Sequence, residues 1–574
     1  MFIFQKSHAK EKRSINVPLI LSTISVAFCI STVCAQPVSI WVTAGDQSKL
    51  LQKQPNLTFG NSANSTKITL NETTKYQTID GFGECMTEGS AESIYSLAAK
   101  QQDSVLNLLF NMQTGAGMSV MRITVGASDL GNGTYTYSLV AGDTAMNNFS
   151  FKGVDSTYLI PILKKVVALN PNIKILACPW TPPIWMKTVQ AYKGGSLQPQ
   201  YYAAYAKYWV KYIQGMKANG IPIWAITVQN EPLNPNNTPS CTWTQQTEAT
   251  FDNKYLGPAF TAAGITTKII AYDHNCDVTA YPIYVCTTST YVDGAAFHLY
   301  GGSISAMTTV HNATKKNVYF TEQCTCSDDF NGNYTGHMRD VFMGSLSNWS
   351  KCVIEWNLST DANLGPHTSD GGCGVCVGGV MVNNSTSFTL KASYYTFATF
   401  SKVIKTDAIR VATTSTNNNL MTIAAINPDG SRGVVVYNNT GSSSTFDVVW
   451  NNQAVPFTLA NNAAASFLWQ GPVRAEDRKV APQVAFATIH NFPEPFTSST
   501  RITFNLTKSA NASVVVYNSK GNIVASLMKG NHEMGTHSVL WNGRDASGRT
   551  VSAGVYMVKL EAEGYSIAKR ICKQ

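Results

Sequence analysis

Two glutamates, Glu231 and Glu322, each close a short apolar run in this chain of 574 residues. One run spans residues 223–228 and the other residues 317–321, and both are rich in hydrophobic and β-branched side chains. Such runs predict buried strands, with each carboxylate lying where the strand gives way to a loop. Two carboxylates that converge on one cleft are the groups that cleavage of a glycosidic bond requires.

The elements that would position these glutamates predict a closed parallel barrel. Between about residues 77 and 406, strand-like runs alternate with helical stretches such as 201–217. The runs are 119–123, 174–178, 221–228, 268–271, 294–298, 317–322 and 352–356. This alternation predicts a (β/α)8 barrel, an α/β fold whose active site lies at the carboxyl ends of the strands. The glutamate spacing corresponds to about three βα units of ~30 residues, so their strands should not be neighbours.

Two further β-rich regions flank the predicted barrel. Short strands at 420–426, 433–437 and 444–450 predict an antiparallel β-sandwich over residues 407–470. Strand-like residues 36–76 are expected to pair with it, because an unpaired edge would otherwise be exposed. A polar linker over 471–484 then precedes residues 485–574, whose strands at 501–506, 513–517, 537–541 and 554–560 predict a small immunoglobulin-like sandwich.

The first 35 residues have the pattern of a secretory signal peptide. Lys6, Lys10, Lys12 and Arg13 precede an apolar stretch from 17 to about 33, and a small-residue cleavage site ends at Ala35. This predicts a secreted or cell-surface protein. A membrane anchor is the alternative, although several Ser and Thr interrupt the stretch. No later segment has the apolar length needed to span a bilayer.

Charge and cysteine content narrow the class of protein. The formal charge is +9, but no Lys/Arg-rich run is present, so the sequence gives no case for nucleic-acid binding. Of the 13 cysteines, two fall in the predicted leader, and the odd number left implies a free thiol or an intermolecular bond. Cys373 and Cys376 form a C-x-x-C motif without a second pair at zinc spacing. A local disulfide or reduced thiols are therefore favoured over a metal site.

Ordered motifs between residues 81 and 411 resemble glycoside hydrolase family 30, which includes glucosylceramidases and β-1,6-glucanases. A lone Asn-Glu-Pro is only moderately specific, whereas the ordered set is highly specific. The matching segments are Gly81-Phe82-Gly83, Met121-Arg122-Ile123, Ser128-Asp129-Leu130, 179–187, Asn230-Glu231-Pro232, His298-Leu299-Tyr300, Thr321-Glu322 and Trp356-Asn357-Leu358.

The resemblance implies a retaining hydrolase, with Glu231 as general acid/base and Glu322 as nucleophile. That mechanism needs Glu322 ionised and Glu231 protonated at the working pH, and the charge of one should raise the proton affinity of the other. No metal or organic cofactor is expected, since two carboxylates and water suffice. Asn230 resembles the residue that binds the sugar 2-hydroxyl, and Arg122 is expected to hold the nucleophile, with an ordinary buried ion pair as the alternative.

Other matching positions are expected to bind substrate. Asp129, Trp180 and Trp356 correspond to residues that hold the glucosyl unit, since an indole face covers the apolar side of a pyranose. Taken alone, either tryptophan would more often belong to the core. Tyr300 should lie within reach of Glu322, while for His298 a structural role is nearly as well supported as a catalytic one.

Several residues near these motifs carry no firm role. Asp273 and His274 close the strand before His298, and the evidence is evenly balanced on whether they line the cleft. Glu355 alternates with Trp356 and should point outward. The sequence has Gly83-Glu84-Cys85-Met86-Thr87-Glu88 where the family often has Gly-Gly-Ala-Phe-Thr-Asp, and neither extra carboxylate, Glu84 nor Glu88, is explained. The loop with Cys373 and Cys376 is expected to shape the aglycone side.

The last module resembles the FlgD-like immunoglobulin fold, through residues 492–496, 541–545, 548–549 and 553–556. In some Gram-negative bacteria this fold serves secretion or anchoring, which implies the outer-membrane secretion machinery as a partner. A spacer or a carbohydrate-binding module is the alternative.

The substrate is the least determined property. Segments 193–199 and 271–277 look closer to β-1,6-glucan-cleaving members than to lipid hydrolases. Hydrolysis of glucosylceramide, a sphingolipid, or of xylan is the alternative within the enzyme class. A non-catalytic glycan-binding protein would be expected to lack one of the two carboxylates.

Overall fold

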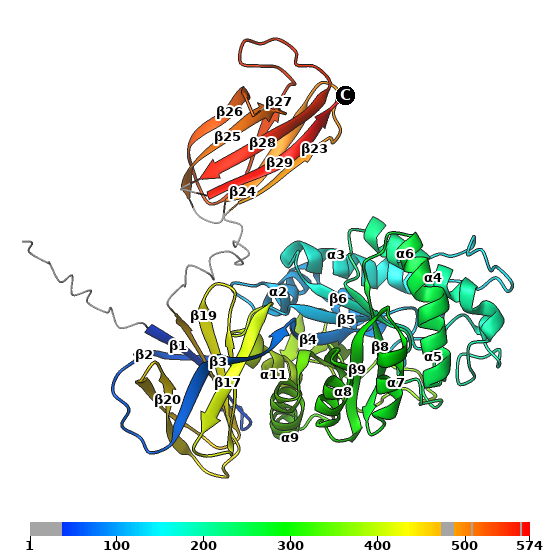
Figure 1. Cartoon of the computed structure of the whole chain (residues 1–574), viewed down its shortest axis with the longest axis vertical. Helices are drawn as coiled ribbons and strands as arrows, with labels where there is room; N and C mark the ends of the chain where they lie inside the picture. The colour runs from blue at the N-terminus through cyan, green and yellow to red at the C-terminus, as the bar shows by residue number, and fades with distance from the viewer. Residues whose placement is uncertain (1–36, 472–486, 507–508, 520, 563–564) are drawn as a thin grey trace, which may run out of the picture.

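The computed structural model describes residues 37–471, 487–506, 509–519, 521–562 and 565–574 (Figure 1). It contains a parallel barrel, an antiparallel β-sandwich and a C-terminal module of strands, which confirms the predicted fold class. The predicted leader and residues 472–484 of the predicted linker lie outside the described residues. No helix in the described part of the chain is long and apolar enough to cross a membrane.

Eight parallel strands close into a barrel in the order β10-β12-β4-β5-β6-β7-β8-β9. Strands β7 and β10, which precede the two glutamates, are separated by β8 and β9, as their spacing predicts. Every residue of β4 and β5 is buried, because the barrel core covers one face of the strands and the helices cover the other. The barrel strands are β4 (Gly81–Met86), β5 (Val120–Thr124), β6 (Lys174–Cys178), β7 (Ala225–Thr227), β8 (Lys268–Cys276), β9 (Val292–Gly302), β10 (Asn317–Glu322) and β12 (Ser350–Glu355).

Helices surround the barrel on its outside (Figure 1). The longest, α4, buries Tyr202, Tyr205, Trp209, Tyr212 and Met216, whose spacing of three or four residues places them on one face. That spacing predicts the helix within a residue of its observed start. The helices are α1 (Glu88–Tyr95), α2 (Ala99–Phe110), α3 (Ile160–Leu169), α4 (Tyr202–Ala218), α5 (Gln245–Phe251), α6 (Gly257–Ala262), α7 (Ala280–Thr288), α8 (Ala306–Thr314), α9 (Phe330–Gly336), α10 (Gly344–Ser347) and α11 (Ala392–Ser401).

Strand β8 is longer than its sequence predicts, because it continues through a bulge. Its pairing with β9 jumps from Tyr272–Ala296 to His274–Phe297, which leaves Asp273 as an extra residue. Tyr272 and Asp273 both have positive φ, 77° and 57°. Bulges bend a strand and re-aim its side chains. Here the bulge turns the Asp273 carboxylate into the barrel.

The β-sandwich is a nine-stranded sheet in the order β2-β1-β22-β19-β18-β17-β3-β20-β21. Its N-terminal strands confirm the predicted pairing of residues before the barrel with those after it. One face, including Ile423 and Val435, joins the barrel core, and the other, including Trp450 and Trp469, forms a core of its own. The strands are β1 (Pro37–Ala44), β2 (Gln52–Thr58), β3 (Lys67–Ile79), β17 (Ala408–Ser415), β18 (Leu420–Ile426), β19 (Ser431–Asn438), β20 (Ser444–Trp450), β21 (Gln453–Leu459) and β22 (Ala463–Gln470).

The C-terminal module consists of two facing sheets, β23-β24-β27 and β26-β25-β28-β29. Trp541, Phe504, Val514 and Leu560 belong to a separate hydrophobic core between them. The strands are β23 (Ala487–Phe492), β24 (Thr500–Leu506), β25 (Ala510–Asn518), β26 (Ile523–His532), β27 (Gly535–Trp541), β28 (Gly554–Ala562) and β29 (Tyr565–Lys573).

Two small sheets follow the last barrel strands in the chain. Strand β11 (Thr325–Cys326) pairs with β14 (Cys376–Val377), just beyond Glu322. Strands β13 (Ser359–Asp361), β15 (Val380–Asn384) and β16 (Ser387–Leu390) form the second sheet. The first of these sheets therefore connects the loop after β10 with the loop that holds Cys373.

Candidate active site

The nine predicted site residues gather around the carboxyl ends of the barrel strands. Several of them line a cavity of about 450 Å³, including Asp129, Glu231, Tyr300, Glu322 and Trp356. Their positions are Arg122 in β5, Asp129 in the following loop, Trp180 after β6, Asn230 and Glu231 after β7, His298 and Tyr300 in β9, Glu322 at the end of β10 and Trp356 directly after β12.

Glu231 and Glu322 face each other across a short gap. One carboxylate oxygen of each and a ring nitrogen of His298 all lie within 4.8 Å of one another. His298 Nδ1 is 3.4 Å from Glu231 Oε1 and 3.7 Å from Glu322 Oε1. The imidazole is fully buried, so it acts on both carboxylates without screening by bulk water.

The second oxygen of Glu231 is held by the loop that follows it. Asn234 Nδ2 donates to Glu231 Oε2 over 2.8 Å, and Asn237 Nδ2 donates to the same atom over 3.3 Å. Glu231 itself has a positive φ of 45°, and its N–H donates to the Asp273 carbonyl over 3.0 Å. Non-glycine residues in this conformation concentrate at functional sites, where surrounding contacts fix them.

Glu322 is held from two sides. Arg122 Nη1 forms a close ion pair with Glu322 Oε2, and the Tyr300 hydroxyl donates to Glu322 Oε1 over 3.1 Å. Arg122 Nη2 also donates to Asn230 Oδ1 over 2.7 Å. The expected contacts of Arg122 and Tyr300 with the second glutamate are therefore present.

Asp273 forms the buried floor of this network. Its carboxylate accepts hydrogen bonds from Thr227 Oγ1 at 2.7 Å and Thr321 Oγ1 at 2.6 Å, and it forms an ion pair with Arg122 at 2.8 Å. His298 Nε2 lies 3.1 Å from Asp273 Oδ1, the oxygen that also accepts from Thr321. Burial raises the pKa of Asp273, but the Arg122 charge and the His298 contact outweigh it and hold that pKa well below its ordinary value. Asp273 therefore supports the site from beneath.

His274, the neighbour of Asp273, lines the cavity, with its Nδ1 3.8 Å from Glu231 Oε1. Burial lowers the pKa of His274, and the negative charge of Glu231 only partly opposes this effect. Of the two residues that sequence left undecided, one therefore faces the cavity and the other lies below it.

Two tryptophans form an aromatic wall beside the glutamates. The rings of Trp180 and Trp356 stack with centroids 5.2 Å apart, and the Arg122 guanidinium lies 5.0 Å from the Trp180 centroid. Within the described residues, buried Trp180 Nε1 has no hydrogen-bond acceptor. Buried indole N–H groups usually have one, so this donor is left unsatisfied in the empty site.

The protonation pattern differs from the one expected from sequence. Burial lowers the pKa of His298, but the charge of Glu322 and the contacts with Asp273 and Glu231 raise it to about 9. Burial raises the pKa of Glu231, yet the bond to His298 and its charge lower it to about 2. Burial raises the pKa of Glu322 despite the opposing charges of His298 and Arg122. In the empty site these shifts favour a proton on the imidazole over one on Glu231, against the expectation from sequence.

Asp129 is positioned by Glu88, for which sequence analysis found no role. The Ser128 N–H donates to Glu88 Oε1 over 2.7 Å, and the Ser128 and Thr124 hydroxyls donate to Oε2 over 3.0 and 3.1 Å. Burial, together with the charges of Glu322 and Glu231, raises the pKa of Asp129 to about 8. Glu88 thus fixes the loop that presents a carboxyl group to the cavity.

Glu84 and Glu355 lie outside the cavity. They are directly paired residues on neighbouring strands β4 and β12, and both are fully buried. Glu355 accepts from His337 Nδ1 over 2.6 Å, on the helical side of the barrel, which agrees with the predicted outward direction. Burial raises the pKa of Glu84 well above its ordinary value. Both carboxylates belong to the packing between the barrel and its helices.

Sequence analysis missed Asn234 and Asn237 as well as Glu88. The Asn-rich stretch 234–237 after Glu231 is a visible signal, since amide side chains there are close enough in sequence to bind the preceding carboxylate. Glu88 offered no such signal, because its partners lie 36 and 40 residues away.

Comparisons with known proteins agree with this geometry. Residues 79–404 match the glycosyl hydrolase family 30 TIM-barrel domain, and residues 407–467 match the family 30 β-sandwich domain. The chain therefore belongs to glycoside hydrolase family 30 and is a glycoside hydrolase. Residues 491–565 match the FlgD Ig-like domain.

The chain is also similar to individual members of the family. The chain is 36% identical over 412 residues to endo-1,6-beta-D-glucanase neg1 of Aspergillus fumigatus, covering 66% of this chain and 83% of that protein. It is 28% identical over 438 residues to putative glucosylceramidase 1 of Caenorhabditis elegans, covering 70% and 83%. The solved structure of the endo-beta1,6-glucanase BT3312 superimposes with a TM-score of 0.73 at 34% identity, covering 76% of this chain and 99% of that one. These relatives support a β-glucan hydrolase.

Proposed function

We propose that this protein is a retaining endo-β-1,6-glucanase that cleaves its glucan by double displacement. The observation that carries the proposal is the close approach of Glu231 and Glu322, whose nearest oxygens lie within 4.8 Å of each other. Retaining enzymes hold their two carboxyl groups about 5–5.5 Å apart, whereas inverting enzymes leave about 6.5–9.5 Å for a water molecule. The short gap supports attack by a carboxylate on the sugar itself.

In this proposal Glu322 attacks the anomeric carbon. Its ion pair with Arg122 and its hydrogen bond from Tyr300 orient the attacking carboxylate, and the Arg122 charge favours its ionised form against the effect of burial. The attack forms a covalent glycosyl-enzyme as the leaving oxygen departs. Water then attacks the same carbon from the opposite side, so the product keeps the β configuration.

Glu231 delivers the proton to the leaving oxygen, and His298 stores that proton in the empty site. The imidazole lies 3.4 Å from Glu231 Oε1, and its pKa is raised to about 9. Sugar binding displaces water from Glu231, which disfavours its charged form and so favours transfer of the proton across this contact. In the second step Glu231 takes a proton from the attacking water.

The remaining residues bind the glucosyl unit. The indole of Trp356, which lines the cavity, suits the apolar side of a pyranose, and Trp180 stacks behind it. Asp129 and Asn230 bind further hydroxyls, with the 2-hydroxyl assigned to Asn230. Hydrogen bonds to that hydroxyl strengthen in an oxocarbenium-like transition state.

The substrate assignment rests on the relatives named as endo-1,6-β-glucanases, which are about a third identical to this chain. Glucosylceramide is the second candidate, because a relative named as a putative glucosylceramidase is 28% identical. The test is a product analysis with β-1,6-glucan, glucuronoxylan and glucosylceramide as separate substrates. We expect internal cleavage of the glucan, with NMR detecting β-configured oligosaccharides as the products. Release of ceramide with no glucan cleavage would reverse the assignment.

The same experiment includes matched variants. Glu322→Gln is expected to abolish glucan cleavage, whereas Glu92→Gln, on half-buried surface of α1, should leave it unchanged. Equal cleavage by the wild type and Glu322→Gln would contradict the proposal that Glu322 is the nucleophile.

We further propose that the protein is exported, through the leader over residues 1–35, and that its FlgD-like module engages an outer-membrane secretion system. The module in question is the one whose residues 491–565 match the FlgD Ig-like domain. Deleting residues 487–574 should retain the enzyme inside a Gram-negative host that secretes the full chain. Equal extracellular activity from both forms would contradict the role of the module.

A further inference from the structure

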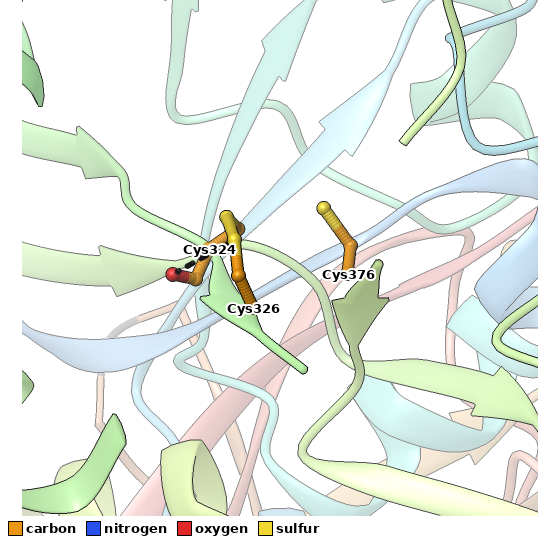
Figure 2. Close-up of side chains that lie close together, drawn as sticks. All are labelled: Cys324, Cys326 and Cys376. Atoms are coloured by element: carbon orange, nitrogen blue, oxygen red, sulfur yellow. Dashed lines mark hydrogen bonds between the residues drawn. A yellow bond between two sulfur atoms is a disulfide. The ribbon is translucent and has the colours of Figure 1, made fainter. Parts of the chain in front are cut away.

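Four cysteines meet where the loop after β10 approaches the loop before β14. Cys324 and Cys326 form one disulfide, and Cys373 and Cys376 form another. Figure 2 shows the sulfur of Cys376 directed toward the Cys324–Cys326 pair. The sulfur atoms of Cys324, Cys326 and Cys376 all lie within 4.8 Å of one another. In the sequence, Cys373 and Cys376 lack a second cysteine pair at zinc spacing, which argued against a metal site. The fold supplies that second pair by bringing Cys324 and Cys326 next to Cys376.

The backbone holds these cysteines in place without the disulfides. Cys326 and Cys376 are directly opposite each other in the β11–β14 ladder. The Ser327 N–H donates to the Val375 carbonyl over 2.8 Å, and the Thr325 hydroxyl donates to the Val377 carbonyl over 2.7 Å. These bonds would remain if both disulfides were reduced, so the four thiols would stay together.

Side chains behind the loop add further support. His337 Nε2 lies 3.1 Å from the Cys324 carbonyl oxygen, and the Cys326 N–H donates to Asn333 Oδ1 over 3.2 Å. Hydrogen bonds of this kind orient ligand-bearing segments around metal sites. They fix the C-x-C half of the cluster independently of its sulfur chemistry.

We propose that, when reduced, Cys324, Cys326, Cys373 and Cys376 bind one thiophilic divalent cation of the Zn²⁺ class. Zinc–thiolate bonds of about 2.3 Å in a tetrahedron place sulfur atoms ~3.8 Å apart. The three clustered sulfurs already lie within 4.8 Å, and the Cys373 sulfur is bonded to that of Cys376. Once the S–S bonds are reduced, the four side chains are free to rotate toward the tetrahedral spacing.

The redox step balances with a dithiol as reductant. Each of two dithiol molecules gives two electrons and two protons to one protein disulfide and leaves as its own cyclic disulfide. The four protein thiols then lose protons to the buffer as their sulfurs bind the cation. Disulfides and metal are therefore alternative states of the same four side chains.

The cavity gives the cation a path to this site. Cys324, Cys373 and Cys376 line the same cavity of about 450 Å³ as Glu231 and Glu322. The metal would join the loop that follows Glu322 to the neighbouring loop that holds Cys373 and Cys376. The inference concerns the rim and does not depend on which glycan the enzyme cleaves.

The test uses the full chain, reduced with a dithiol and freed of it by gel filtration without oxygen. Titration with Co²⁺ should give one equivalent bound, with intense sulfur-to-cobalt charge-transfer absorption that Zn²⁺ abolishes by displacement. Cys376→Ser and Cys326→Ser should each weaken binding at least tenfold. Cys572→Ser, which removes a half-buried free cysteine of the C-terminal module, should bind as the wild type does.

Three results would overturn the proposal. The first is reduced wild-type protein that shows no charge-transfer band with Co²⁺. The second is equal binding by Cys376→Ser and Cys572→Ser. The third is a thiol titration that still finds both disulfides after the dithiol treatment. Near-ultraviolet circular dichroism of each variant checks that it is folded. The first result is decided by the cobalt absorption spectrum of the wild type alone.

Discussion

Arg122 joins the charged residues of the site into one buried unit. It is fully buried and donates to Glu322, Asp273 and Asn230. Its single positive charge faces two carboxylates, those of Glu322 and Asp273, and the imidazolium of His298 supplies a second positive charge. Removing one partner from such a cluster leaves a charge buried without compensation, which costs about 3–5 kcal/mol. Substitutions here should therefore affect several neighbours together.

The division of roles between the glutamates can be tested by chemical rescue. Glu231→Ala should slow hydrolysis of β-1,6-glucan about 10²–10⁴-fold, because a poor leaving group needs a general acid. Formation of the glycosyl-enzyme from a dinitrophenyl β-gentiobioside should be affected little, since that leaving group needs no proton. Added azide should then yield a β-glycosyl azide, detected by NMR. An α-azide, or equal slowing for both leaving groups, would contradict Glu231 as acid/base.

The pH profile tests His298 as the proton store. The pKa of His298 is raised from 6.5 to about 9, so its protonated form persists to alkaline pH. The kcat/KM of the wild type should fall as pH rises through about 9, and in His298→Asn this limb should move to lower pH. The same shift makes the stabilising effect of His298 complete below pH 6.5 and lost as pH rises through about 9. An unmoved alkaline limb in the variant would exclude His298.

At the scale of elements, irregularities in two strands bring the site together. The bulge in β8 turns Asp273 inward, and the pairing of β10 with β9 slips by one residue between Phe320 and Glu322. Regular alternation would send every second side chain into the helical layer. The bulges therefore allow neighbouring residues to contribute to one cluster.

Helix α1 positions Asp129, which we propose binds substrate, through its first residue, Glu88. Glu88→Ala leaves the Ser128 N–H buried without an acceptor, which should lower the free energy of unfolding by about 1–3 kcal/mol. The freed loop should also raise KM for β-1,6-glucan more than it lowers kcat. Urea unfolding and steady-state kinetics measure both effects.

Glu92→Ala is the control for that substitution. Glu92 lies one turn further along the same helix and accepts from Asn132 Nδ2 over 2.7 Å at the surface. Its loss should change stability by less than about 0.5 kcal/mol. Equal effects on KM from both variants would show that Glu88 has no special link to Asp129.

Local sequence predicted the strands and the two glutamates because burial and helix–strand alternation are encoded within each segment. Residues 174–178 and 317–322 coincide with β6 and β10. The bulge at Asp273 was not predictable, since it depends on how β8 pairs with β9. The partners of Glu88 and the meeting of two cysteine pairs were likewise set by contacts between distant segments. The proton position also depended on distances that only the folded site supplies.

Among the described residues, the barrel and the sandwich share a hydrophobic core, whereas the C-terminal module has a core of its own. The barrel core includes residues of the sandwich, such as Ile423 and Tyr437, and α11 contacts both β4 and β22. The core of the C-terminal module includes only its own residues. The barrel and the sandwich should therefore unfold together, and the module should unfold by itself.

Calorimetry of Trp541→Ala tests this division. Trp541 is almost fully buried in the core of the module, so its truncation should cost about 3–5 kcal/mol. Only one of two thermal transitions should move to lower temperature, and glucan hydrolysis should stay unchanged. A single transition that moves as a whole would show that all three parts unfold as one unit.

The proposed chemistry requires a covalent bond between the glycan and Glu322. A 2-deoxy-2-fluoro β-gentiobiosyl fluoride should inactivate the enzyme and accumulate that intermediate, because the fluorine slows its hydrolysis more than its formation. Peptide mass spectrometry should then find one glycosyl group, attached to Glu322. A label on any other residue, or turnover with inversion and no label, would contradict the account.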